Sequence, residues 1–179
     1  MFNIIVAMEE SIQNQIEVSG NSLSLGGKTY HCAIGKSGII AEKDKREGDG
    51  ATPAGLYMLR KVMYRKDKIG EIETGLPKEV LEENDGWCDD MDLPQYNQQI
   101  KLPFAGSYEN LWREDDVYDV IIPIGYNDSP VYHGYGSAIF MHIAREGYSP
   151  TAGCVAVSLP DMLEILPQLN PETTIKINL

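Results

Sequence analysis

The chain has 179 residues, 42% of them hydrophobic, which is enough for one domain with its own core. The formal net charge is −12 and the pI is about 4.6, so the surface repels nucleic-acid phosphates and anionic lipid. No apolar run approaches the roughly 20 residues that a membrane helix needs. Composition therefore argues against a nucleic-acid-binding protein and against a helical membrane protein, and it does not identify a substrate.

The N-terminus and the cysteines bear on the compartment. Residues 2–8 form an apolar run without the basic start and the longer apolar stretch of a secretory signal. We therefore expect a cytoplasmic protein, or a periplasmic one if a leader has been removed. The three cysteines, Cys32, Cys88 and Cys154, are too few for a disulfide framework and suit a reducing compartment.

The first third of the chain predicts short strands separated by turns that contain Gly, Ser and Asn. The charged segment 43–50 contains Gly48-Asp49-Gly50 and predicts a loop. The expected strands cover residues 2–8, 16–18, 23–25, 29–34 and 55–62.

The remaining two thirds predict an irregular excursion followed by a return to order. Residues 64–118 are polar and weakly periodic, and we expect one or two short helices there. Apolar strands are expected at 120–124, 137–143, 154–157 and 173–179. Between the last two, Ser158 is suited to cap a short helix that has Pro160 in its first turn. The sequence thus predicts a mainly β single domain over residues 1–179, with few short helices.

His142 and Cys154 are the residues that suggest chemistry. His142 ends one apolar strand, and Cys154 begins the next after a loop that contains Gly147 and Pro150. If the two strands are neighbours, the imidazole lies beside the sulfur. A thiol needs such a base because free cysteine is mostly protonated at neutral pH, and a neighbouring His⁺ would lower the thiol pKa.

Gly153 precedes the cysteine and fits the same hypothesis. A glycine there permits an unusual backbone angle and a close approach of substrate. The backbone N–H groups of Gly153 and Cys154 are then candidates for an oxyanion hole, in which each donor is worth roughly 3 kcal/mol.

Two other interpretations compete with a catalytic pair. His142 and Cys154 are also consistent with ordinary core residues of two strands, because unpaired cysteines are often buried. A zinc site is a weaker alternative, since the three histidines and three cysteines show no C-x-x-C or H-x-x-x-H spacing.

Several ordered segments carry a family resemblance. Thr151-Ala152-Gly153-Cys154-Val155, with His142 upstream, resembles the signature of the L,D-transpeptidase catalytic domain of the YkuD type. Other segments resemble a compact bacterial branch of this family and extend the likeness over roughly residues 28 to 169: Gly48–Tyr57, Asp85–Asp90, Tyr126–Asp128 and Gly136–Phe140.

The resemblance implies a β-sandwich-like fold, a Cys154 nucleophile and a His142 base. It also departs from the family at two positions. Ala152 stands where members usually have His, and Ala156 stands where an Arg is common. Arg145 is the nearest replacement for a carboxylate-binding Arg, and a solvated loop charge is the equal alternative.

Further residues are expected around the substrate, although a purely structural role is an alternative for several of them. Thr151 belongs to the signature. Trp87 and Tyr126 suit a cleft wall, although aromatic residues are more often core, and Asn127 suits polar substrate groups or a turn cap.

The implied reaction concerns peptidoglycan stem peptides or muropeptides. Cys154 would attack the carbonyl of an L-centred diamino acid and release the terminal D-alanine, leaving a thioester. Water as acceptor gives an L,D-carboxypeptidase of wall recycling, which we favour for a cytoplasmic protein. A second stem peptide gives an L,D-transpeptidase that forms 3-3 cross-links. A non-catalytic peptidoglycan-binding module is the third hypothesis. The resemblance also suggests a covalent carbapenem adduct on Cys154, and it implies no metal and no organic cofactor.

Overall fold

The computed structural model of the protein describes residues 14–179, so the strand predicted at residues 2–8 lies outside the described part. The strands of the described part are β1 (Gln15–Ser19), β2 (Ser22–Leu25), β3 (Lys28–Ala33), β4 (Ile39–Ala41), β5 (Thr52–Met58), β6 (Val62–Tyr64), β7 (Lys78–Val80), β8 (Asp85–Cys88), β9 (Gln99–Lys101), β10 (Tyr108–Asn110), β11 (Val120–Pro123), β12 (Phe140–Ile143), β13 (Val155–Val157) and β14 (Thr174–Asn178).

Short helices join the strands. The α-helices are α2 (Lys66–Ile69) and α3 (Leu159–Ile165), and the 3-10 turns are η1 (Glu42–Asp44), η2 (Asp116–Tyr118), η3 (Glu146–Tyr148) and η4 (Leu166–Gln168). Helix α3 begins as predicted, because Ser158 Oγ accepts a hydrogen bond from the backbone N–H of Asp161 at 3.2 Å. Its Met162 and Ile165 side chains are buried, whereas Leu163 is exposed.

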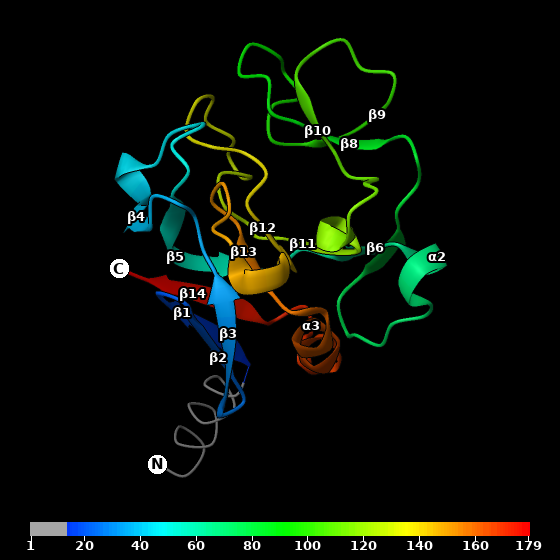
Figure 1. Cartoon of the computed structure of the whole chain (residues 1–179). Coiled ribbons are helices and arrows are strands. Elements are labelled where there is room, and N and C mark those ends of the chain that lie inside the picture. Colours follow the sequence, from blue (N-terminus) through cyan, green and yellow to red (C-terminus); the bar gives the residue numbers. More distant parts are fainter. Residues whose placement is uncertain (1–13) are drawn as a thin grey trace.

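The strands form a large sheet and a small one. The large sheet has 11 strands in the order β4-β5-β14-β1-β2-β3-β13-β12-β11-β6-β7, and the small sheet has three in the order β10-β8-β9. The small sheet lies at the top of Figure 1, at the opposite end of the molecule from the β1–β2 hairpin.

The large sheet curls so that its two halves share one core. Val18 of β1 and Ile177 of β14 belong to the same apolar cluster as Met141 of β12 and Val155 of β13. Helix α3 contributes Met162 to this cluster. The fold is therefore mainly β and sandwich-like, which confirms the predicted fold class.

Strands β12 and β13 are buried on both faces. Met141 and Val155 face the main core, whereas Phe140 and Cys154 belong to a second cluster that includes Ile121. The two strands run parallel, with His142 opposite Ala156. Burial on both faces explains why these segments read as continuous apolar runs in the sequence.

The single strand predicted at residues 55–62 is wrong, because the chain is interrupted there. β5 ends at Met58 and pairs with β14, whereas β6 begins at Val62 and pairs with β11. Between them the Arg60 N–H donates to the Pro123 carbonyl at 3.1 Å. The chain thus passes from one half of the sheet to the other within an apolar run, which hydrophobic pattern alone does not reveal.

Residues 64–118 were predicted to be irregular with one or two short helices. The short helix is present as α2, but the prediction missed four strands, β7 to β10. β7 joins the large sheet beside β6, and β8, β9 and β10 form the small sheet. Each of these strands has only three or four residues. Such short strands cannot show the alternation from which strands are predicted.

The strand predicted at 137–143 begins later, at Phe140. Ala138 has a positive φ of 52°, so the backbone bends just before β12. Its N–H donates to Asn97 Oδ1 at 3.0 Å, and its carbonyl accepts from the Cys154 thiol at 3.2 Å. Contacts with distant side chains therefore replace strand pairing here.

Candidate active site

Cys154 and His142 lie on one face of the neighbouring strands β12 and β13. Parallel pairing places Met141 opposite Val155 and His142 opposite Ala156, and Cys154 directly precedes this register. Side chains alternate along strands, so Cys154, Ala156 and His142 share a face. Both groups line a cavity of about 350 Å³. The structure thus brings the predicted pair together at one cavity.

The Cys154 thiol is buried and held by the backbone before β12. It donates to the Ala138 carbonyl at 3.2 Å, and the Phe140 N–H points at the sulfur over 3.4 Å. Burial raises the pKa of the thiol to about 12, with Glu109 adding to the rise and the Phe140 N–H opposing it. The expectation that a histidine cation lowers this pKa is wrong for the resting site, since desolvation disfavours the thiolate.

His142 is buried and neutral, and its tautomer is set by the backbone. Its Nδ1 lies 2.9 Å from the carbonyl oxygen of Ile143, so Nδ1 carries the proton and Nε2 has a free lone pair. The Tyr118 ring meets the imidazole edge to face at 5.4 Å. Burial lowers the imidazole pKa to about 4, although the Ile143 carbonyl favours the cation. A neutral base with a free Nε2 is what a general base requires.

Thr151 organises the turn that ends at the cysteine. Its hydroxyl donates to the Cys154 carbonyl at 2.7 Å and accepts from the Gly153 N–H at 3.1 Å. Gly153 has a positive φ of 141°, and a Cβ there would lie 2.8 Å from the Ala51 carbonyl oxygen. The geometry therefore requires glycine at this position. Because the Gly153 N–H already has a partner, it can serve an oxyanion only after leaving Thr151.

Two other segments fix this turn in place. The Thr151 N–H donates to the Ile34 carbonyl and the Lys36 N–H donates to the Thr151 carbonyl, each at 2.9 Å. The hydroxyl oxygen of Thr52, the first residue of β5, accepts a hydrogen bond from the Gly35 N–H at 2.9 Å. The start of β5 therefore supports the cysteine turn through the chain that leaves β3.

The small sheet covers the Cys154 cluster. The Trp87 ring of β8 meets the Phe140 ring edge to face at 5.0 Å. Asn97 has a positive φ of 57° and joins three segments. Its Oδ1 accepts from Trp87 Nε1 and from the Ala138 N–H, each at 3.0 Å, and its Nδ2 donates to the Tyr126 and Asn127 carbonyls. Asn97 thereby helps to fix the Ala138 carbonyl that receives the thiol.

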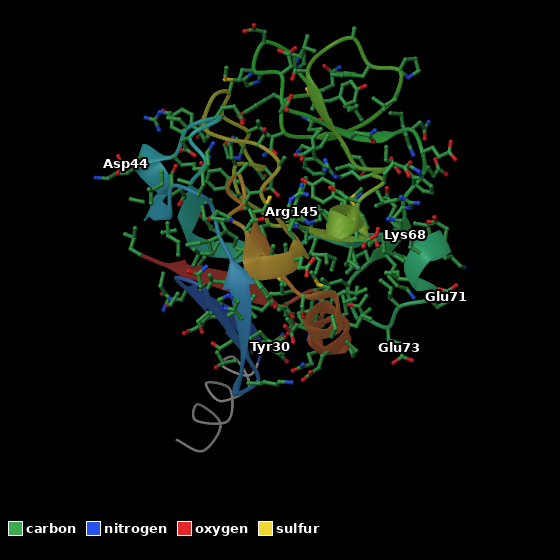
Figure 2. All side chains as sticks on the ribbon, in the orientation of Figure 1. Tyr30, Asp44, Lys68, Glu71, Glu73 and Arg145 are labelled. Atoms are coloured by element: carbon green, nitrogen blue, oxygen red, sulfur yellow. The ribbon has the colours of Figure 1, made fainter. Side chains whose placement is uncertain are left out.

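Charged side chains of both signs line the cavity. Lys45 is buried there and pairs with Asp49 at 2.8 Å. Arg145 also lines the cavity and approaches Asp115 at 3.2 Å, and it lies near the centre of the molecule beside η3 in the view of Figure 2. Tyr118 donates to Glu109 at 2.6 Å, and both belong to the wall. No sequence motif pointed to Lys45, Glu109 or Tyr118, which lie after η1, in β10 and in η2.

Only some of the predicted substrate residues line the cavity. Thr151 and Arg145 belong to the cavity wall, whereas Trp87, Tyr126 and Asn127 do not belong to it as the structure describes it. Tyr126 is a core residue whose hydroxyl donates to the Tyr135 carbonyl at 2.5 Å. Asn127 has a positive φ of 49° and closes a turn by bonding Tyr132 and Gly136. The contacts therefore fit the alternative interpretations, in which Tyr126 is a core residue and Asn127 caps a turn.

No group of three or more His, Cys, Asp or Glu side chains in residues 14–179 is arranged to hold a metal ion. No helix among these residues is long and apolar enough to cross a membrane.

The fold and the site define a mainly β protein with a buried Cys–His pair at a charged cavity. Residues 14–177 match the family model of the L,D-transpeptidase catalytic domain, YkuD. The chain therefore belongs to this family of cysteine-dependent enzymes, whose activity concerns peptidoglycan. A search of curated proteins and a search of solved structures each gave no match.

Proposed function

We propose that the protein is an L,D-carboxypeptidase that removes the terminal D-alanine from muropeptide tetrapeptides through a thioester on Cys154. The observation that carries this proposal is the placement of the Cys154 thiol and the neutral His142 imidazole in the wall of one cavity. The backbone carbonyl of Ile143 holds the proton of the imidazole on Nδ1, which leaves Nε2 available as the base.

Acylation begins with a proton transfer. As the carbonyl carbon of the L-centred diamino acid approaches, Cys154 Sγ gives its proton to His142 Nε2 and forms the C–S bond. The tetrahedral intermediate collapses when the C–N bond to D-alanine breaks, and His142 returns the proton to the leaving amine. Because the resting thiol is protonated, the transfer of its proton to the imidazole accompanies the attack on the carbonyl carbon.

Deacylation uses water in the proposed reaction. His142 Nε2 takes a proton from water, the oxygen attacks the thioester carbonyl, and the proton passes to Sγ as the C–S bond breaks. A cross-linking enzyme must hold two stem peptides at the thioester. The cavity volume of about 350 Å³ is near the lower end of the roughly 300–1,000 Å³ of small-ligand sites, which supports a single bound peptide.

Arg145 is the proposed partner for the carboxylate of the terminal D-alanine. It lines the cavity, and its side chain is more than half exposed. Its ion pair with Asp115, at 3.2 Å, therefore contributes little free energy, and the side chain can leave Asp115 to bind a ligand at small cost. Arg binds a carboxylate with two parallel hydrogen bonds. This contact would take the place of the family's Arg, for which this chain has Ala156.

The proposed compartment is the cytoplasm, where recycled muropeptides are found. Cys32, Cys88 and Cys154 are all free thiols in the structure, which suits a reducing environment. Localisation by fractionation with a tagged full chain tests this proposal, and recovery from the periplasm would contradict it.

The experiment is mass spectrometry of a disaccharide-tetrapeptide incubated with wild type, Cys154→Ala or Cys32→Ala. Cys32 is a matched control because it is another buried thiol, in β3 and outside the cavity wall. Loss of one D-alanine with wild type and Cys32→Ala, but not with Cys154→Ala, supports the carboxypeptidase. A carbapenem mass increment on the same two proteins alone would mark Cys154 independently.

Two other outcomes decide against the proposal. Cross-linked dimers formed with a second stem peptide, in place of tripeptide, would make the protein an L,D-transpeptidase. Binding of the peptide to wild type and Cys154→Ala alike, with no turnover in either, would leave the peptidoglycan-binding module.

A further inference from the structure

One carboxylate in the cavity wall lacks a partner. Asp89 Oδ1 is buried and makes no hydrogen bond to any residue that the structure describes. Burying a carboxylate oxygen without a partner costs stability, so such groups are rare away from functional sites. Asp89 lines the cavity that contains Cys154.

The position of Asp89 follows from the strand alternation in the small sheet. Asp89 directly follows β8, and its N–H donates to the Ser107 carbonyl at 3.3 Å, so the pairing on the β10 side continues to this residue. Asp89 comes two residues after Trp87, and the alternation of side chains therefore places both on the same side of the sheet. Glu109 pairs with Trp87 across β8 and β10 and shares that face too. Since the Trp87 ring contacts Phe140, this face is turned toward the Cys154 cluster. Asp89 and Glu109 are therefore two carboxyl groups over one cavity.

Other acidic groups of the described residues have protein partners, unlike Asp89. Asp119 Oδ1, the other buried side-chain oxygen without a hydrogen bond in residues 14–179, lies 3.0 Å from Lys68 Nζ. Glu47, also in the wall, accepts from Tyr96 and from Ser137. Glu109 accepts one hydrogen bond, from Tyr118, and burial raises its pKa, with Asp89 adding to the rise. A cation beside Asp89 would relieve both effects.

We propose that Asp89, assisted by Glu109, binds the side-chain ammonium group of the diamino acid whose carbonyl Cys154 attacks. This inference rests on the proposed function. An ammonium has three N–H donors and so can serve Asp89 Oδ1 and a second oxygen at once. The site then selects acyl donors whose side-chain amine is free over those in which the amine is acylated.

The test is calorimetric binding to Cys154→Ala of two tetrapeptides that differ only in acetylation of the side-chain amine. The free amine should bind roughly tenfold to a hundredfold tighter, as expected for a charge-assisted hydrogen bond. Adding Asp89→Asn should reduce the preference to roughly threefold or less. Asp92→Asn is the matched control, since it removes an equal charge from an exposed position of the same loop, outside the cavity wall, and it should keep the preference.

Folding is checked by thermal unfolding. Asp89→Asn should not lower Tm, because it removes an unpartnered buried charge. Equal binding of the two peptides, no binding of either, or an unchanged preference in Asp89→Asn would overturn the inference. Turnover by the wild type is scored separately. Turnover without an amine preference retains the carboxypeptidase and overturns this inference, whereas an amine preference without turnover supports the inference and removes the proposed reaction.

Discussion

At Cys154 and His142, burial sets the protonation state of the resting site. Desolvation disfavours both the thiolate and the imidazolium, so the thiol pKa rises to about 12 and the imidazole pKa falls to about 4. The pair is therefore a neutral acid and a neutral base.

The depressed pKa of His142 predicts a pH dependence of stability. The imidazole pKa is about 4 in the folded protein and 6.5 in the reference state, so the unfolded chain binds more protons between these values. The resulting stabilisation is complete above the unfolded pKa and is lost as pH falls toward the folded one, by up to about 3 kcal/mol. His142→Asn, whose amide can still donate to the Ile143 carbonyl, should lose this component.

The measurement is urea unfolding of wild type and His142→Asn from pH 4 to pH 8. Carboxyl groups titrate in both proteins, so the difference between the two curves isolates the histidine. Parallel curves would show that the imidazole is not buried in its neutral form. The acid limb of kcat/KM should likewise lie well below the usual range of histidine.

Thr151 predicts a second effect at the residue scale. Thr151→Val keeps the shape but removes the donor to the Cys154 carbonyl and the acceptor of the Gly153 N–H. The two groups left without partners should cost about 1–3 kcal/mol of stability, and kcat should fall as the turn loosens. Thr151→Ser should restore most of both, as measured by urea unfolding and D-alanine release. A fall in kcat that serine does not restore would point to the methyl group instead.

The residues of the site could be predicted from the sequence in part. His142, Gly153 and Cys154 stand within one motif. The structure places Gly153 and Cys154 in one turn, and His142 and Cys154 at one cavity. The protonation state could not be predicted, since it depends on burial by segments far away in the chain. Tyr118 and Glu109 were missed for the same reason: they reach the cavity through η2 and the small sheet, whose position no local pattern encodes.

At the scale of elements, the small sheet packs on β12 and on the segment that precedes it. Its Trp87 packs on Phe140, and Asn97 ties it to Ala138. Asn97→Asp keeps the size of the side chain but turns an N–H donor pair into an oxygen that faces two carbonyls. We expect a loss of about 1–3 kcal/mol of stability and a fall in turnover as the Ala138 carbonyl shifts.

The control for this prediction is Gln98→Glu, the next residue, which is exposed and adds an equal charge. Thermal unfolding and D-alanine release are measured on both variants. Equal behaviour of Asn97→Asp and Gln98→Glu would show that the Asn97 bonds do not hold the two elements together.

The elements differ in how well the sequence predicts them. β1, β2, β3, β11, β13 and β14 follow apolar runs or alternation bounded by turn residues, and their predicted positions are correct to within a residue or two. β7 to β10 are too short to show a period, and β8 pairs with two strands, β9 and β10, that both follow it in the chain. The break between β5 and β6 arises because the two strands pair with different partners, β14 and β11. Strand pairing depends on the tertiary structure, so the local sequence does not reveal the break.

At the scale of the whole molecule, the C-terminal strand holds the large sheet together. β14 pairs with β1 over Thr174–Asn178 and with β5 on its other side. It therefore joins the first hairpin to β5, whose first residue, Thr52, supports the cysteine turn. Ile175 and Ile177 are 0% and 2% exposed in the shared core. Removing β14 would expose two sheet edges and open that core.

We therefore expect that deletion of residues 174–179 abolishes the native fold, whereas deletion of Leu179 alone, which is 83% exposed, has little effect on Tm. The measurement is dispersion of the amide proton NMR spectrum together with cooperative thermal unfolding. Because the cysteine turn is supported by the start of β5, which pairs with β14, D-alanine release should disappear with the fold. A truncated protein that unfolds cooperatively and still turns over substrate would show that the half of the sheet containing β11, β12 and β13 is stable without its partner half.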